Sequence, residues 1–190
     1  MEGVIMPYSA VAIANFFIKK GLDEKVPLSN MKVQKLVYFA HAIYSASYDK
    51  LLVGEPFVAW PHGPVVVSLH QELEIYEEKP ITSQIFSLDV EKSSVVCKPE
   101  EVPSFDTETI KFLELTWQKL SPYTAWQLRE LSHDRGGAWF HTVDDYFKRL
   151  NLGRKEQNKK EIDINNFQDL YNNLPRNLTI LDEDIKECGR

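Results

Sequence analysis

The fold of this chain is decided by residues 30–47, which read NMKVQKLVYFAHAIYSAS. Apolar residues recur there at the i, i+3, i+4, i+7 spacing of one helix face, and Met31 and Phe39 widen that face. Ser29 or Asn30 can supply the side-chain oxygen that caps the first turn. The pattern therefore predicts a helix near the centre of the domain. Its apolar face comprises Val33, Leu36, Val37, Ala40, Ile43 and Tyr44.

Further helices are predicted on both sides of this segment. A first helix should run from Ala10 to Lys20, with Ser9 as its cap and Gly21 as its stop. Asp106 or Thr107 should cap another helix, and the Ser121-Pro122 pair should start the one after it, which Gly136-Gly137 would break. The remaining helices are expected over residues 65–76, 139–150 and 165–174.

Two segments have the residue pattern of strands. Residues 57–60 predict a short strand, and residues 85–90 with 94–98 predict a small hairpin. The fold class expected is therefore mainly α: a compact single-domain bundle of about six to seven helices with a small β-hairpin or short strands. We expect an N-terminal extension over residues 1–8, the domain over 9–175 and an acidic tail over 176–190.

Composition and charge narrow the classes of function. The net charge of -6 argues against a nucleic-acid partner, because phosphate backbones are bound by a concentrated basic face. Two distant cysteines, Cys97 and Cys188, indicate free thiols and a reducing compartment. No stretch approaches the ~20 apolar residues of a membrane helix. We therefore expect a cytoplasmic protein that has no membrane partner.

Motifs for chemistry are missing from the sequence. The five histidines lack metal-ligand spacing, and no nucleophile elbow or phosphate-binding glycine loop occurs. We predict no catalytic residue, no cofactor and no metal. One alternative stays open, in which a small-ligand binder or enzyme has a pocket where Trp60, His62, His133 and Trp139 converge, with Gln34 and Lys35 nearby.

One tryptophan is predicted to be exposed. Trp126 falls off the apolar stripe of Ala125, Leu128 and Leu131 in its predicted helix. Large exposed aromatic side chains are typical of interfaces, so Trp126 is a candidate contact for a partner.

Several motifs occur in a characteristic order. They are Ala10-x-x-Ile13-Ala14-Asn15-Phe16-Phe17, then MKVQKLVYFA at 31–40, then AWPHGPVV at 59–66. Leu131-Ser132-His133 with Trp139, and a final segment over 164–171, follow. Over residues 9–172 the chain resembles the Panacea domain family of SocA-like antitoxins, which are also described as phage-associated proteins.

The resemblance implies a mostly helical bacterial or prophage protein that is not an enzyme. Many such proteins are antitoxins that neutralise an unrelated toxin encoded beside them by direct binding, and one member of the family delivers its toxin to a protease. The partner expected is a cognate toxin or a host factor, and the oligomeric state stays open. The family often has an aromatic residue where this chain has His62, so no role is carried to that position. The chain also lacks an attached helix-turn-helix, so DNA-binding autoregulation is not expected.

The resemblance also assigns a set of family-motif residues. Most of them are expected to hold the domain together: Gly63 and Pro64 by fixing a turn, Trp60 and Trp139 by filling the core. The full set is Lys35, Tyr38, Trp60, Gly63, Pro64, His133 and Trp139.

Overall fold

The structure, a computed structural model, describes residues 7–91, 94–103, 106–143 and 160–161. This part of the chain contains five α-helices, one 3-10 helix and a further helical segment over residues 138–143, with short antiparallel strands. The predicted mainly helical class is confirmed. The predicted helix over 165–174 and the acidic tail lie outside the described residues, as does the predicted helix beyond residue 143.

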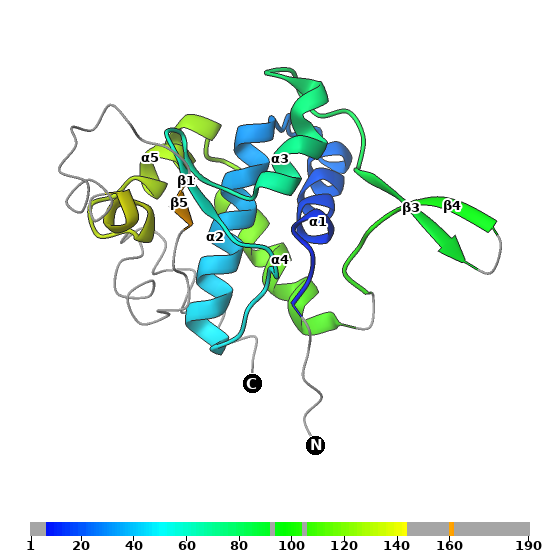
Figure 1. Cartoon of the computed structure of the whole chain (residues 1–190), viewed down its shortest axis with the longest axis horizontal. Helices are drawn as coiled ribbons and strands as arrows, with labels where there is room; N and C mark the ends of the chain where they lie inside the picture. The colour runs from blue at the N-terminus through cyan, green and yellow to red at the C-terminus, as the bar shows by residue number, and fades with distance from the viewer. Residues whose placement is uncertain (1–6, 92–93, 104–105, 144–159, 162–190) are drawn as a thin grey trace.

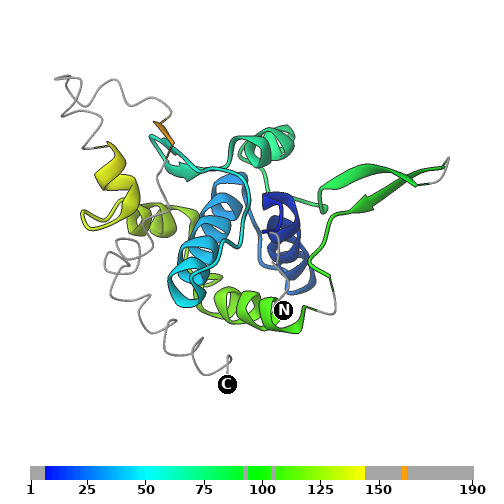
Figure 2. The same cartoon turned by 60° about the horizontal axis from the view of Figure 1, so that its bottom comes forward.

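Helix α2 (Asn30–Tyr48) lies at the centre of the fold (Figure 1). It packs against α1 (Ala10–Asp23), α3 (Val67–Leu73), α4 (Thr107–Leu120) and α5 (Ala125–Ser132). Figure 2 shows these neighbours placed around it. Of its 19 residues, 15 are buried, so its polar residues are covered together with its apolar face. The sequence pattern predicted the central position of α2 but not the burial of its polar side.

Side-chain caps define the starts of α1, α2 and α4, as predicted. Ser9, Ser29 and Asp106 each accept a hydrogen bond from a backbone N–H in the first turn. The predicted end of α1 at Gly21 is wrong, because the helix continues to Asp23. Gly21 allows a close approach instead: a Cβ atom there would lie 2.8 Å from Leu28 Cδ1.

The predicted start of α5 at Ser121-Pro122 is also wrong. These two residues lie in the turn after α4, and α5 begins at Ala125. Thr124 and Gln127 form a capping box, in which each side chain accepts from the other residue's backbone N–H. Because this box satisfies two otherwise unpaired donors, it stabilises a helix start at Ala125.

A tight antiparallel pair separates α2 from α3. Strand β1 (Val58–Trp60) pairs with β2 (Gly63–Val65) and with β5 (Lys160–Glu161). The predicted helix start at Val65 is wrong: α3 begins at Val67 and is followed by the 3-10 helix η1 (Glu74–Tyr76). The backbone at Val66 is held extended by the Gln34 side chain, which accepts from its N–H (3.0 Å) and donates to its carbonyl (3.2 Å).

The predicted hairpin is present as β3 (Phe86–Glu91) and β4 (Ser94–Pro99), and it extends away from the helices (Figures 1 and 2). Its base is bound by the buried amide of Asn15 in α1. Asn15 Oδ1 accepts from Ile85 N at 2.8 Å, and Nδ2 donates to the carbonyls of Ile85 and Glu100, both at 2.9 Å. One side chain of the first sequence motif therefore sets where both strands leave the core.

His41 is a fully buried residue of α2. Its Nδ1 accepts a hydrogen bond from Val53 N at 3.0 Å, and its Nε2 lies 3.4 Å from Ser45 Oγ. Burial lowers the pKa of His41 from 6.5 to about 4. The ring is therefore neutral at physiological pH and holds the chain segment that follows α2.

This burial predicts an acid-sensitive fold. Between the unfolded pKa of 6.5 and the folded pKa of about 4, the unfolded chain binds the proton that the native His41 does not, so stability falls as pH falls through this window. We expect the free energy of unfolding in urea to drop by about 2 kcal/mol more between pH 7 and pH 5 in the wild type than in His41→Gln. His141→Gln is the control and should keep the wild-type slope. Equal slopes in all three proteins would contradict the prediction.

Candidate partner-binding surface

Two successive side chains of α2 bind the backbone of the β1–β2 pair and the residue after it. Gln34 makes the two hydrogen bonds to Val66, and Lys35 Nζ donates to the carbonyl of Pro64 at 2.8 Å. The Lys35 side chain is almost completely buried. Burial, and then the positive charge of Arg129, lower the pKa of Lys35 to about 7. The structure therefore places Lys35 beneath the turn as an anchor for its backbone.

Gly63 fits a space that admits no side chain. Its φ of 99° lies in the region that favours glycine. A Cβ atom would lie 2.6 Å from Ser132 Oγ and 2.8 Å from Lys35 Cε. The absence of a Cβ at Gly63 therefore allows β2 to pack directly on α2 and α5.

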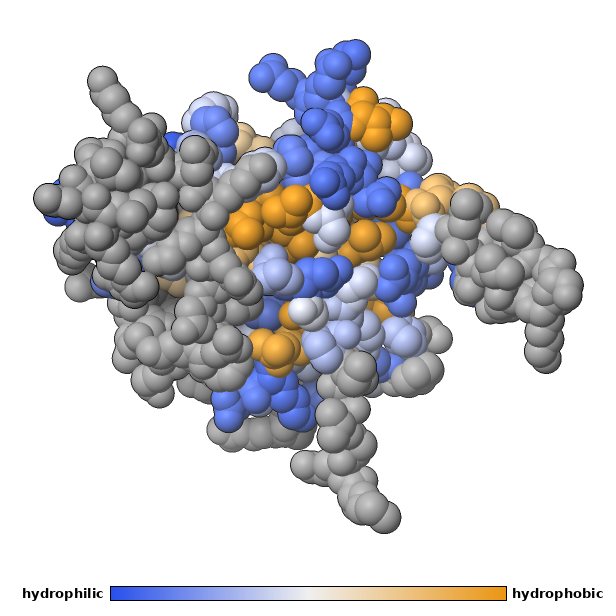
Figure 3. All heavy atoms as spheres, viewed as in Figure 1, coloured by the Kyte–Doolittle hydropathy of each residue, from blue (hydrophilic) through white to orange (hydrophobic). Residues whose placement is uncertain are grey.

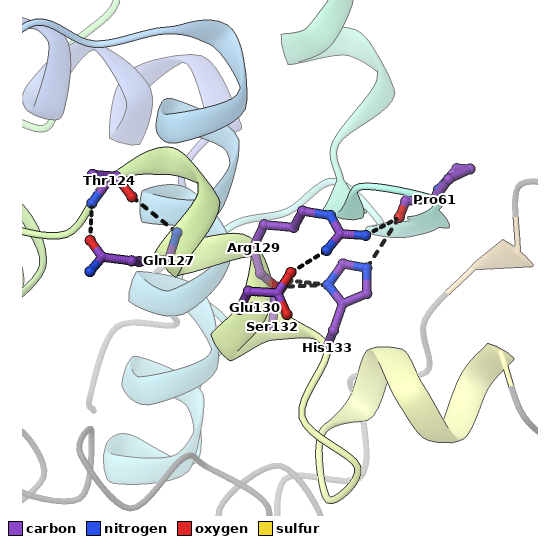
Figure 4. Close-up of polar contacts among 7 residues, drawn as sticks. All are labelled: Pro61, Thr124, Gln127, Arg129, Glu130, Ser132 and His133. Carbon is purple, nitrogen blue, oxygen red and sulfur yellow. Dashed lines mark hydrogen bonds and ion pairs between the residues drawn. The ribbon is translucent and has the colours of Figure 1, made fainter.

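His133 and Trp139 bind the other side of the same turn, and Figure 4 shows the His133 ring directed at the Pro61 carbonyl. The His133 ring caps the end of α5, with Nδ1 2.7 Å from the Arg129 carbonyl and Nε2 3.1 Å from the Pro61 carbonyl. Trp139 Nε1 donates to the Trp60 carbonyl at 2.9 Å, and the Trp139 ring lies 3.7 Å from the His133 ring. The turn is therefore bound by side chains from α5 and from the helical segment that follows it.

The electrostatics of this cluster favour a neutral His133. Partial burial lowers the pKa of His133, and the positive charges of Arg129 and Lys35 act in the same direction. The two carbonyl contacts oppose this effect without reversing it. A neutral ring donates through one nitrogen only, and the Arg129 guanidinium also donates to the Pro61 carbonyl, at 3.4 Å.

The two remaining family-motif residues lie in different environments. Tyr38 is buried in the core, where its ring meets Phe57 edge to face at 5.5 Å, and burial raises the pKa of its hydroxyl. Trp60 is half-buried and packs edge to face on His70 at 4.8 Å. Trp139 fills the core as predicted, with 6% of its surface exposed, whereas Trp60 does not.

Trp126 is exposed, as its position off the helix stripe predicted. Its side chain is 59% accessible, meets the His62 ring edge to face at 5.9 Å, and lies 5.5 Å from the Arg129 guanidinium. Arg129 forms an ion pair with Glu130. We call the set Trp126, His62, Arg129 and Glu130 the turn–α5 surface; Arg129 is partly buried, and the other three are exposed. Arg129 was not among the predicted site residues, although its position three residues after Trp126 places both on one face of a helix.

The large hydrophobic side chains at the surface are few. Figure 3 shows apolar residues in the middle of the face seen in Figure 1, with hydrophilic residues among and around them. Within the described residues the exposed large hydrophobic side chains are Leu22, Leu51, Ile75, Phe86 and Trp126. Of these, only Trp126 has an arginine guanidinium stacked against its ring, so it combines the two residue types that dominate binding energy at interfaces.

The open alternative predicted that Trp60, His62, His133 and Trp139 converge. The structure brings His133 and Trp139 into contact with the backbone at Trp60 and Pro61, while the His62 ring contacts Trp126. The described part of the chain holds no group of three His, Cys, Asp or Glu side chains that could bind a metal ion. No helix in that part is long and apolar enough to cross a membrane.

The motif cluster, from Lys35 to Trp139, lies within a segment that matches a known protein family. Residues 33–140 match the family described as "Antitoxin SocA-like, Panacea domain", and the chain belongs to that family. It is similar to the protein named Antitoxin SocA from Caulobacter vibrioides (strain NA1000 / CB15N), at 29% identity over 170 residues. That alignment covers 89% of this chain and 88% of the relative. No solved structure matches the chain.

The close packing at Gly63 predicts the effect of adding one methyl group. Gly63→Ala should lower the free energy of unfolding by roughly 2 kcal/mol or more, because the left-handed backbone is strained and the Cβ displaces Lys35 or Ser132. Urea denaturation measures the change. Gly54→Ala is the matched control, since its nearest contact would be an ordinary 3.4 Å from Pro7 Cγ. A loss for Gly63→Ala no larger than for Gly54→Ala would contradict the prediction.

Burial of the Lys35 amine predicts a rise in stability with alkaline pH. From the folded pKa of about 7 up to the unfolded value of 10.5, the unfolded chain binds the proton that native Lys35 has lost, so stability increases with pH. The wild type should gain about 2 kcal/mol in urea unfolding between pH 7 and pH 9. Lys35→Met should lack this gain, and Lys19→Met, at an exposed position, should retain it. A gain that persists in Lys35→Met would rule out this assignment.

Proposed function

We propose that this protein is an antitoxin that neutralises a partner toxin by binding it directly, and that it is not an enzyme. Family membership and the similarity to Antitoxin SocA support the antitoxin role. The polar side chains of Lys35, His133 and Trp139 contact backbone within the domain, which supports a binding function that depends on the surface. The toxin expected is the product of the neighbouring gene.

The observation that carries the proposal is the exposed Trp126 on a rigid support. Its neighbours His62 and Arg129 belong to a turn and a helix that are bound to the core through Lys35, His133 and Trp139. A preorganised surface loses little entropy on binding, and a desolvated tryptophan beside an arginine is a typical hot spot. The turn–α5 surface is therefore the contact site proposed for the toxin.

The enzyme alternative is weaker on chemical grounds. His133 has both ring nitrogens near backbone carbonyls, and Lys35 donates to Pro64 while almost completely buried. A general base must reach the proton it removes from a substrate, and these groups face the protein's own backbone. A host factor in place of a toxin would use the same exposed surface and is distinguished by the identity of the bound protein.

Removal of the Trp126 side chain tests the proposal. Trp126→Ala should weaken the complex with the neighbouring gene's product at least about tenfold and abolish the rescue of growth on co-expression, because hot-spot truncation costs about 2 kcal/mol. Isothermal titration calorimetry and a growth assay measure the two effects. The fold should be unaffected, since Trp126 is outside the core.

Ile75→Ala is the matched control, because Ile75 is 79% exposed on η1. It should bind and rescue like the wild type. Failure of the wild-type protein to bind or rescue would refute the antitoxin role. Equal binding by Trp126→Ala and the wild type would refute the surface. The half-life of the toxin with and without the antitoxin separates masking from delivery to a protease, since only delivery shortens it.

A further inference from the structure

A groove opens at the amino-terminal end of α2, beside the start of α5. Its volume is about 410 Å³, and three loops form it: the α1–α2 connection, the segment before Ile81 and the α4–α5 turn. The backbone of Ile81 donates to the Leu28 carbonyl at 2.8 Å, which joins the first two loops. The apolar part of the lining comprises Val26, Pro27, Leu28, Pro80, Pro122, Tyr123 and Ala125.

Lys32 is the only positively charged residue among the groove's lining residues. Its surface is only 7% exposed, and its Nζ donates to the Ser121 carbonyl at 2.7 Å. An ammonium group has three N–H donors, so this contact uses one of them. Burial lowers the pKa of Lys32, and no carboxylate contributes to the shift. Lys32 is therefore a desolvated cation whose charge is not neutralised within the described residues.

The groove's own acid does not neutralise this charge. Glu78 belongs to the lining but is exposed, and no ion pair within 4.0 Å joins it to Lys32 among the described residues. A buried charge without a counter-ion is unfavourable, and an incoming carboxylate recovers part of that cost. An occupant with a carboxylate at this point is therefore complementary in charge to Lys32.

We propose that this groove binds an extended segment of the partner protein that carries an acidic side chain beside an apolar one. The carboxylate accepts a hydrogen bond from Lys32, and the apolar side chain packs on Leu28 and Tyr123. Because Ala125 lines the groove and Trp126 follows it in α5, one partner can cover both features. This inference rests on the proposed partner binding and adds the chemistry of the bound segment.

The test uses a display library of short random peptides, so that it does not depend on the toxin. Peptides are selected against the wild-type protein, Lys32→Met and the matched control Lys19→Met, whose side chain is 58% exposed on α1. Circular dichroism and thermal melting check that each variant folds. The wild type and Lys19→Met should enrich peptides with Asp or Glu next to an aliphatic or aromatic residue, and Lys32→Met should lose that preference at least about tenfold.

Ala125→Glu is a second variant, which keeps the inference testable if Lys32→Met is unstable. It places a carboxylate in the groove at the first position of α5, where helices favour an acid, and it should abolish the enrichment. No enrichment of acidic peptides by the wild type, or the same enrichment by both groove variants, overturns the inference. The toxin-binding assay tests the antitoxin role independently of the groove. If the wild type does not bind the toxin, the antitoxin role is refuted, while the peptide result still tests the groove.

Discussion

The fold depends on one constraint: helix α2 is buried on every side, although it carries charged and polar residues. Each buried polar group needs a partner, and the partners lie on the segments that surround α2. Gln34 binds Val66, Lys35 binds Pro64, and His41 binds Val53. The polar residues of the central helix therefore fix where the surrounding chain runs, which an apolar helix of the same shape would not do.

The same use of polar side chains to bind backbone occurs at the motif residues around the β1–β2 turn. Lys35 and His133 were expected in or near the pocket of the open alternative. Instead Lys35 donates to the Pro64 carbonyl, and the His133 ring contacts the carbonyls of Arg129 and Pro61. What they hold in place is a small surface containing His62 and Trp126. A protein that acts by covering another protein requires such a fixed surface, since disorder there would reduce the binding energy.

The sequence predicts the elements better than their ends, and the reasons are tertiary. Spacing identified α2, and side-chain oxygens identified its cap and that of α1, because both signals are local. Gly21 lies within α1 and packs closely on Leu28, and the extended backbone at Val66 is bound by Gln34, which is 32 residues away in the sequence. The candidate surface was predictable in part. The position of Trp126 outside the apolar stripe of its helix predicted its exposure, but the contact between His62 and Trp126 is visible only in the folded structure.

Lys32 and Lys35 illustrate how the same residue type serves structure or binding within one helix turn. Both are buried lysines of α2, and both donate to a backbone carbonyl. Lys35 is enclosed by Gly63 and Ser132, so no other molecule can reach its amine. Lys32 lines an open groove, and a second acceptor can approach it from outside. Burial alone therefore does not separate an anchor from a binding group; access to the charged atom does, and by that criterion Lys32 is the cation of α2 that a partner can use.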